Sequence, residues 1–358
     1  MRPEDARLRG ESFNEVLDGI GTVKFGVDFF NQYCALLRGL RIRGDIVANV
    51  QGGTLQELYW KIQRSHARRV IFGMEQNLEA NNYDFPDGSA YKKKITQWID
   101  SVERRFPGII TVIDAAPVWK AASKSSSWNN FLKTMPGDEA RVYLWDKDMF
   151  STGDNQSANL ATINLSFSQT IPQWLYQFSK TFPGKKASVW QWGLKPKSSI
   201  YNTMIGCIYI GKFYKFMIDY NKSYGNFISY ASYMSLKSLD RGEGGFKNRD
   251  ATNMAAALKS CGMLFRGNPQ VDDLSISGFN GLSGVALEQN RKYTLLLINE
   301  SGIEASVSAV NINGYKVQGV YRITSLSAST LDSDAVSYET TSGTALRLKP
   351  YSVNVVEF

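Results

Sequence analysis

The sequence has little histidine and little cysteine, and this scarcity excludes several kinds of enzyme site. His66 is the only histidine among 358 residues, and it lies at the polar end of a helical pattern, where we expect a surface position. One histidine rules out most histidine-based catalytic triads and most metal sites built from several imidazoles. Cys34, Cys207 and Cys261 lie far apart in apolar contexts without metal-type spacing, which predicts buried free thiols. We expect no metal and no cofactor.

Long apolar runs, a secretory leader and a basic tract are also missing. No run approaches the roughly 18 apolar residues of a membrane-spanning helix, so we expect no membrane span. The chain opens with the charged segment MRPEDARLRGE instead of a signal peptide. The net charge is +8, but the basic residues form short clusters instead of the concentrated stripe typical of nucleic-acid binding. Nucleic acid is therefore not an expected partner.

Aromatic residues are abundant. The chain contains 18 Tyr, 19 Phe and 8 Trp, and it is long enough for a barrel-sized domain plus a smaller one. Such a content is common where clefts stack on sugars, and it is equally compatible with a well-filled core.

Helical patterns alternate with short apolar runs from residue 27 onward. Strand-sized runs lie at 45–50, 69–74, 109–114, 141–145, 186–192 and 226–232, and helical patterns at 27–40, 54–66, 89–106, 171–182 and 199–220. Thr54 followed by Glu57 forms a capping box that predicts the start of one helix. Apolar strands separated by helices indicate a parallel sheet covered on both faces, as in a (β/α)8-type barrel.

The pattern changes after about residue 255. Strand-sized runs follow at intervals of about ten residues, with Gly, Asn and Ser turns between them, which is typical of an antiparallel β-sandwich. The Gly-rich, charged segment 238–253 separates the region of alternating helices and strands from the region of strands alone. We expect an α/β barrel over residues 1–250 and a β-sandwich over residues 251–358.

Two strand ends carry residues that suggest chemistry, since active sites of (β/α) barrels lie at the carboxyl ends of the strands. Glu75 follows the strand at 69–74, and Gln191 holds the corresponding place in Val189-Trp190-Gln191-Trp192-Gly193. Three further motifs accompany them: Tyr83-Asp84-Phe85-Pro86, Arg105-Phe106-Pro107 and the terminal LRLKPYSVNVVEF.

Over roughly residues 24–358 the order and spacing of these motifs resemble the clan A retaining glycoside hydrolases. The resemblance is strongest to arabinofuranosidase-like and heparanase-like members with a C-terminal β-sandwich. It implies that Glu75 is the acid/base, after strand four, and that Gln191 stands where strand seven of the family carries its glutamate nucleophile. It also makes Met74, Asn49, Trp145, Trp190 and Trp192 candidate substrate-binding residues near strand ends.

The departures from the family pattern bear on activity. A retaining glycosidase needs two carboxyl groups about 5–5.5 Å apart, one to attack the anomeric carbon and one to transfer a proton. Glutamine is neutral, so Gln191 cannot form the covalent glycosyl ester. Met74 replaces the family's Asn, and Trp190 replaces its Thr. Three changes in one site predict a naturally diverged pseudoenzyme.

Structural interpretations of the same residues stay open. Glu75 could be a partly buried carboxylate bonded to nearby backbone or to Gln191, and Trp190 and Trp192 could both pack in the core. Asp146 and Asp148, after the strand at 141–145, are candidate substitute acids or simple loop residues.

The segment before residue 45 is too short for two barrel strands with their helices. An open parallel sheet would leave an unpaired edge. The missing strands come from another chain, a partner or oligomer covers the edge, or the true start lies further upstream; we favour a partner surface.

We consider three functions. The first is a non-catalytic module that binds glycan or serves as a structural component of an extracellular or virion assembly. The second is an active retaining glycosidase on plant or algal polysaccharide that uses Glu75. The third is a scaffold without a sugar site.

Overall fold

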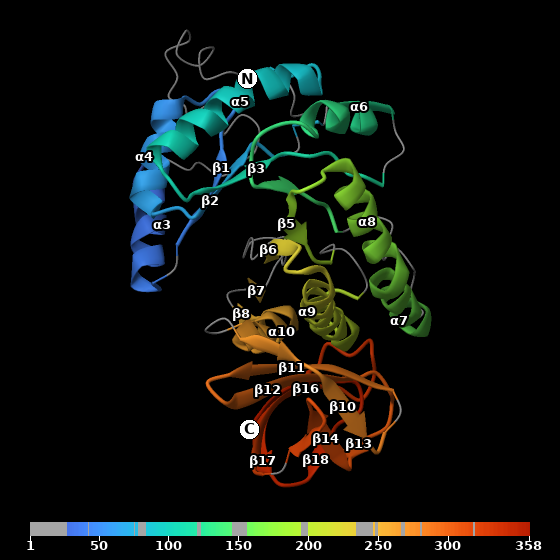
Figure 1. Cartoon of the computed structure of the whole chain (residues 1–358). Coiled ribbons are helices and arrows are strands. Elements are labelled where there is room, and N and C mark those ends of the chain that lie inside the picture. The colour runs from blue at the N-terminus through green and yellow to red at the C-terminus, as the bar shows by residue number, and fades with distance from the viewer. Residues whose placement is uncertain are drawn as a thin grey trace. The chain divides into compact units, whose positions relative to one another are not determined.

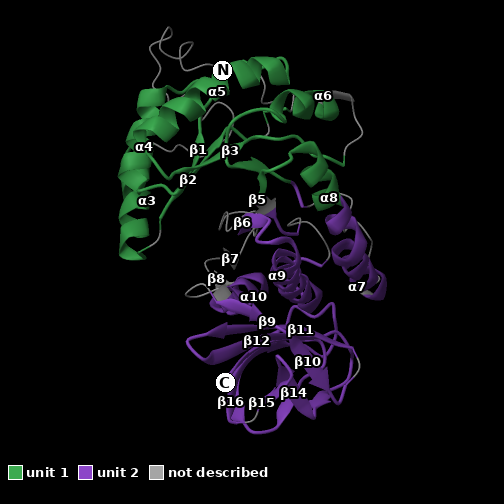
Figure 2. Cartoon of the chain, viewed as in Figure 1, with its two compact units in different colours: residues 1–142, 174–188 green, residues 143–173, 189–358 purple. Residues whose placement is uncertain are grey.

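The computed structural model describes residues 27–41, 43–74, 76–77, 84–119, 123–144, 156–194, 200–233, 246–247, 250–265, 269–279, 281–317 and 319–358. The chain forms two compact units, which Figure 2 distinguishes by colour. Unit 1 comprises residues 1–142 and 174–188, and unit 2 comprises residues 143–173 and 189–358. Within the described ranges, no helix is both long and apolar enough to cross a membrane.

Unit 1 alternates short parallel strands with helices (Figure 1). Its strands are β1 (Asp45–Ala48), β2 (Arg69–Phe72), β3 (Ile110–Ile113), β4 (Glu139–Arg141) and the first part of β5 (Lys186–Trp192). Its helices are α3 (Val27–Gly39), α4 (Leu55–Ser65), α5 (Gly88–Arg105), α6 (Ser123–Leu132) and most of α8 (Ile171–Thr181). Neighbouring strands from β1 to β5 pair in parallel, in sequence order.

Among the described residues the parallel sheet has six strands in the order β1 to β6, with β6 (Ile228–Tyr233) next to β5. Sequential strands joined by helices are the arrangement of a (β/α) barrel, which closes with eight strands. The described chain therefore forms an incomplete (β/α) barrel followed by antiparallel sheets, and this confirms the predicted fold class.

Local sequence signals account for most element boundaries. Thr54 caps α4 by accepting the backbone N–H of Glu57 at 3.2 Å, as the capping box predicts. His66 ends this helix in the left-handed conformation and is exposed, as expected. The strand predicted at 141–145 lies earlier in the structure, where β4 covers Glu139–Arg141. Glu139 and Arg141 are charged but buried, because each forms an ion pair, and a search for apolar runs does not detect such a strand.

Two buried ion pairs connect β4 to other strands of the sheet, one of them to a strand that is not its neighbour. Arg69 of β2 donates to both carboxylate oxygens of Glu139 on β4, at 2.9 and 3.0 Å, across the intervening β3. Arg141, two residues after Glu139, pairs with Asp114 just beyond β3, with 2.6 Å between nitrogen and oxygen. Glu139 and Arg141 share one side of β4 because residues two apart on a strand point the same way.

Unit 2 contains helices and the antiparallel sheets. Its helical elements are α7 (Gln156–Leu165), a π-helical turn (Ser166–Thr170), α9 (Met204–Tyr224), α10 (Asn253–Gly262) and a 3₁₀ turn (Met263–Phe265). Its further strands are β7 (Phe246–Lys247), β8 (Asp250–Ala251), β9 (Gln270–Asp272), β10 (Leu274–Ser277), β11 (Leu282–Gln289), β12 (Lys292–Asn299), β13 (Ala305–Val307), β14 (Ala309–Ile312), β15 (Tyr315–Val317), β16 (Tyr321–Ser327), β17 (Ser337–Gly343), β18 (Leu346–Leu348) and β19 (Ser352–Glu357). The sandwich sheets have the orders β17-β16-β19-β12-β11-β9, β10-β14-β15 and β13-β18.

The central strand β12 shows how the sandwich is buried on both faces. Leu295 and Leu297 belong to a core that also contains residues of the two smaller sheets. Ile298 is buried too and contributes to the opposite face, which α9 covers. A Cβ at Gly211 of α9 would lie 3.1 Å from Val353 and 3.3 Å from Ile298, so a glycine allows this close approach. Burial on both sides explains the unbroken apolar run of β12.

The three cysteines are buried free thiols, as the sequence predicts. Burial raises the pKa of the Cys207 thiol to about 12, and it also raises the pKa of Cys261. The thiolate, which is the reactive form, is therefore suppressed at both positions.

Candidate functional site

The carboxyl end of β2 carries the turn that contains Glu75. Gly73 has a φ of +86°, and a Cβ there would lie 2.6 Å from the Gln76 side chain and 2.9 Å from Val50, so the position requires glycine. Met74 follows and is half-buried, whereas Gln76 is buried. Glu75 itself lies outside the described residues.

Hydrogen bonds hold this turn from neighbouring strand ends. The backbone N–H of Gln76 donates to Asp114 Oδ2 at 2.7 Å, and the Gln76 side chain donates to the Met74 carbonyl at 3.0 Å. Gln51, three residues after β1, donates from its side-chain amide to Gln76 Oε1. The residues that flank Glu75 are thus fixed by groups that follow β1 and β3.

Asp114 is the centre of the buried network beneath the turn. Its carboxylate pairs with Arg141, and the two side chains are 0% and 1% exposed. Its backbone N–H donates to the Tyr91 hydroxyl at 3.0 Å, and that hydroxyl donates to the Phe72 carbonyl at 2.6 Å. Burial, followed by the charge of Asp114, raises the pKa of Tyr91 well above its usual value, so the phenol keeps the proton that it donates.

Asn49 lies in the turn after β1 and accepts hydrogen bonds from the backbone of that turn. Its side-chain oxygen accepts from the N–H of Gly52 at 3.2 Å, and its carbonyl accepts from the N–H of Gly53 at 3.1 Å. A Cβ at Gly53 would lie 2.4 Å from that carbonyl oxygen, so this turn also needs glycine. Asn49 is half-buried and shapes the loop between β1 and α4.

Gln191 is the penultimate residue of β5, three strands along the sheet order from β2. With β1 as the third strand of a barrel, β2 is the fourth strand and β5 the seventh. On this count, which the family resemblance supplies, Gln191 lies on the seventh strand. The Gln191 side chain, Trp145, Asp146 and Asp148 lie outside the described residues.

Trp190 and Trp192 are buried, with 7% and 2% of their surfaces exposed. The Trp190 ring contacts Tyr230, with 5.0 Å between centroids. The Trp192 ring stacks on Phe213, with centroids 3.8 Å apart and an interplanar angle of 5°, while Tyr233 packs edge-on against it. Little of either indole is left for stacking on a sugar.

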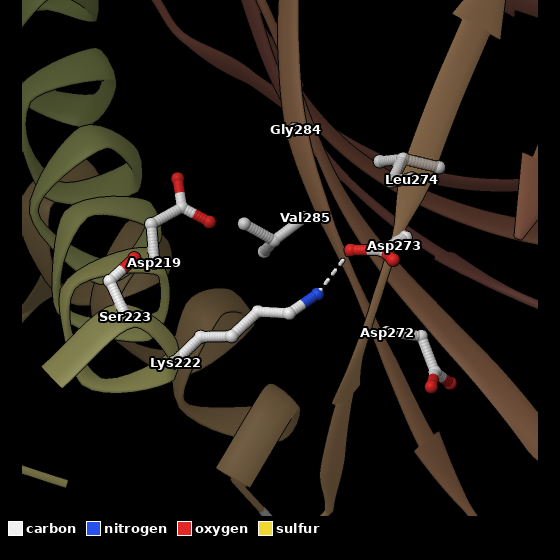
Figure 3. Close-up of a pocket in the computed structure, with 8 residues that line it drawn as sticks. All are labelled: Asp219, Lys222, Ser223, Asp272, Asp273, Leu274, Gly284 and Val285. Atoms are coloured by element: carbon white, nitrogen blue, oxygen red, sulfur yellow. Dashed lines mark hydrogen bonds and ion pairs between the residues drawn. The ribbon is translucent and has the colours of Figure 1, made fainter. Parts of the chain in front are cut away.

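Unit 2 has a pocket of about 540 Å³ beside α9, which Figure 3 shows. Lys222 crosses it to pair with Asp273 at 2.5 Å, and Asp219 pairs with Lys215 at 2.5 Å. Asp272, which also lines the pocket, accepts a hydrogen bond from the Asn313 side-chain amide at 2.9 Å. No group of three or more His, Cys, Asp or Glu side chains in the described ranges could hold a metal ion.

The residues that anchor the Glu75 turn were not anticipated from the sequence. Asp114 and Arg141 each stand at an end of an apolar run, and a charge at such a place is the signal that could have identified them. Gln51, Gln76 and Tyr91 have no comparable signal, because polar residues near strand ends and on helices are ordinary.

Comparison with known proteins supports the fold. The sequence matches no known protein family and no curated protein. A family 51 α-L-arabinofuranosidase from Bifidobacterium longum aligns with a TM-score of 0.60 and 11% identity, over 94% of this chain and 79% of its own. A glucosidase from Croceicoccus marinus aligns with a TM-score of 0.58 and 9% identity, over 93% and 82% of the two chains. A glycoside hydrolase family 30 xylanase from Clostridium acetobutylicum aligns with a TM-score of 0.51 and 12% identity, over 93% of this chain and 72% of its own.

At these identities the likeness concerns the fold alone. The chain has a glycoside hydrolase-like fold, with the incomplete parallel barrel and the antiparallel sheets in the order that the sequence predicts.

Proposed function

We propose that this chain is a catalytically impaired glycoside hydrolase-like protein that binds a glycan through its barrel without hydrolysing it. The observation that carries the proposal is Gln191 on β5, the seventh strand when β1 is counted as the third. A neutral amide there can accept and donate hydrogen bonds to sugar hydroxyls, but it cannot attack the anomeric carbon.

The nearest described carboxylate to the Glu75 turn is unsuited to replace the nucleophile. Asp114 is fully buried, pairs with Arg141 and accepts the N–H of Gln76. A nucleophile must reach the anomeric carbon of a bound sugar, and its lone pairs must be available. Asp114 therefore supports the turn instead of acting on a substrate.

A hydrolysis assay on the full chain tests the proposal. Wild type, Glu75→Ala and Gln191→Glu are incubated with aryl arabinofuranosides, xylosides, glucosides and glucuronides, and the same proteins are applied to a glycan array. Gln63→Glu, an exposed position on α4, is the matched control for the added charge. We expect glycan binding without turnover, and little gain in Gln191→Glu because Met74 and Trp190 have also changed.

Hydrolysis by wild type that Glu75→Ala abolishes would overturn the proposal in favour of an active retaining glycosidase. Absence of any glycan binding would favour a scaffold without a sugar site.

A second candidate function is that of a structural component of an extracellular or virion assembly, with a partner over the barrel edge. Apolar side chains are exposed on the first described elements: Leu36 at 58% in α3 and Val47 at 43% in β1, a strand with one neighbour in the sheet order. A strand at the edge of a sheet offers its backbone groups for pairing with another chain. Light scattering on the purified chain tests it: a monomer at high concentration that captures no partner would argue against this function.

A further inference from the structure

The sandwich of unit 2 carries a second pocket, of about 350 Å³, that combines aromatic rings with cationic side chains. Tyr293, Tyr315 and Phe358 contribute the rings, and Arg291 and Lys316 contribute the charges. We call these five residues the sandwich pocket. Arg291 lies in the β11–β12 turn, Tyr293 in β12, Tyr315 and Lys316 in β15, and Phe358 directly after β19.

Two tight hairpin turns frame the sandwich pocket. Asn290 and Arg291 connect β11 to β12 with φ values of 53° and 64°, and Asn313 and Gly314 connect β14 to β15 with 52° and 82°. Positive φ at both central residues is the signature of type I′ turns, which hold their strands in one register. The pocket is therefore built on two rigid hairpins.

Arg291 occupies a turn position that favours glycine. The other turn has Gly314 at the equivalent place, where positive φ costs nothing, whereas an arginine there is conformationally strained. Its backbone N–H donates to Glu288 Oε1 at 3.1 Å, but that bond would be available to a glycine as well. A strained residue whose exposed side chain lines a pocket indicates a functional role for that side chain.

The rings offer a stacking surface. Tyr315 is 80% exposed, so its face is available to a ligand. Tyr293 and Phe358 are half-buried and pack against the sandwich core, and the backbone N–H of Phe358 donates to the Tyr293 carbonyl at 3.1 Å. Phe358 also meets Tyr321 edge-on, with 5.1 Å between centroids. The pocket thus combines one exposed ring, that of Tyr315, with two rings that pack against the core.

We propose that the sandwich pocket binds an acidic oligosaccharide, with a sugar ring on Tyr315 and a carboxylate or sulfate group held by Arg291 and Lys316. Aromatic faces pack against the apolar side of sugar rings, and an arginine fork matches a carboxylate or a sulfate. Two cations suit a ligand with few charges, whereas a nucleic acid calls for a longer basic stripe. The choice of a glycan rests on the proposed function, although the site is separate from the barrel.

Calorimetric titration of the full chain tests this inference. The probes are a galacturonic acid oligosaccharide, a sulfated galactan oligosaccharide, a neutral xylan oligosaccharide and a single-stranded DNA of similar charge. We expect one or both acidic sugars to bind, and the neutral sugar and the DNA to bind more weakly. Arg291→Gly and Tyr315→Ser are each expected to lower the affinity for the acidic sugar by about tenfold to a hundredfold.

Arg291→Gly is the decisive variant, because it relieves the strained turn. We expect its melting temperature to equal or exceed that of wild type while its affinity falls, so unfolding cannot explain the loss. Tyr338→Ser, at a tyrosine of β17 that is 47% exposed and outside the pocket, is the control and should bind as wild type does.

The inference is overturned if neither acidic sugar binds, if both pocket variants bind normally, or if the neutral sugar or the DNA binds as tightly. Loss of glycan binding in Glu75→Ala but not in the pocket variants would also overturn it, while leaving the proposed barrel function intact. Loss of glycan binding in the pocket variants but not in Glu75→Ala supports the sandwich pocket as the glycan site and counts against the barrel.

Discussion

Replacing Asp114 with asparagine tests how the turn around Glu75 is supported. Asparagine keeps the shape and can still accept the N–H of Gln76, but it leaves the charge of Arg141 without its carboxylate. The two side chains are 0% and 1% exposed and their closest atoms are 2.6 Å apart, so water screens this pair very little. Removing one partner of a buried ion pair typically costs about 3–5 kcal/mol.

A double-mutant cycle separates the pair from its surroundings. We expect Asp114→Asn and Arg141→Met each to lower the stability of unit 1 by about 3–5 kcal/mol. The double variant removes both charges, so it should be more stable than the sum of the single effects predicts, by about 1–3 kcal/mol. Arg104→Met on the exposed side of α5 is the matched control and should change stability by less than about 0.5 kcal/mol.

The assay must report on unit 1, because the chain has two compact units. Hydrogen exchange of peptides from β2 and β3, measured across a urea series, provides this local readout. Exchange at the Glu75 turn should also rise in Asp114→Asn, since the acceptor of the Gln76 N–H is weakened. Single variants within 1 kcal/mol of wild type, or strictly additive effects in the double variant, would refute the reasoning.

Two further predictions concern unit 2 and the thiols. Trp192→Ala should destabilise unit 2 by about 3–5 kcal/mol, whereas Tyr338→Ala, at a residue of unit 2 that is 47% exposed, should cost much less. Equal losses of unit 2 stability by urea denaturation would contradict the core assignment of Trp192. At about pH 8 the native chain should show no rapid reaction of Cys207 or Cys261 with an aromatic disulfide reagent, because burial raises both thiol pKa values, and all three cysteines including Cys34 should react after unfolding. Fast labelling of either buried thiol in the native chain would contradict this.

The sequence predicted the strands that carry the candidate residues, but not the groups that support the turn at Glu75. The glycine before Met74 and the strand that carries Gln191 were recognisable from local pattern and from the family resemblance. The pairing of Asp114 with Arg141 joins residues 27 positions apart, and the bond from the Gln76 N–H to Asp114 joins residues 38 positions apart. No local pattern encodes such contacts.

The sequence by itself determined the type and order of the parallel strands and of most helices between them, because helix caps, apolar periodicity and turn residues act over a few positions. Thr54 and the run of β5 illustrate this: both stand in the structure where the pattern predicts them. The helices α6, α7 and α10 were not predicted. Only the tertiary structure decided which side chains are available for function. Trp192 is enclosed by Phe213 and Tyr233, and Asp114 is committed to Arg141, because packing brings together residues that are distant in the chain.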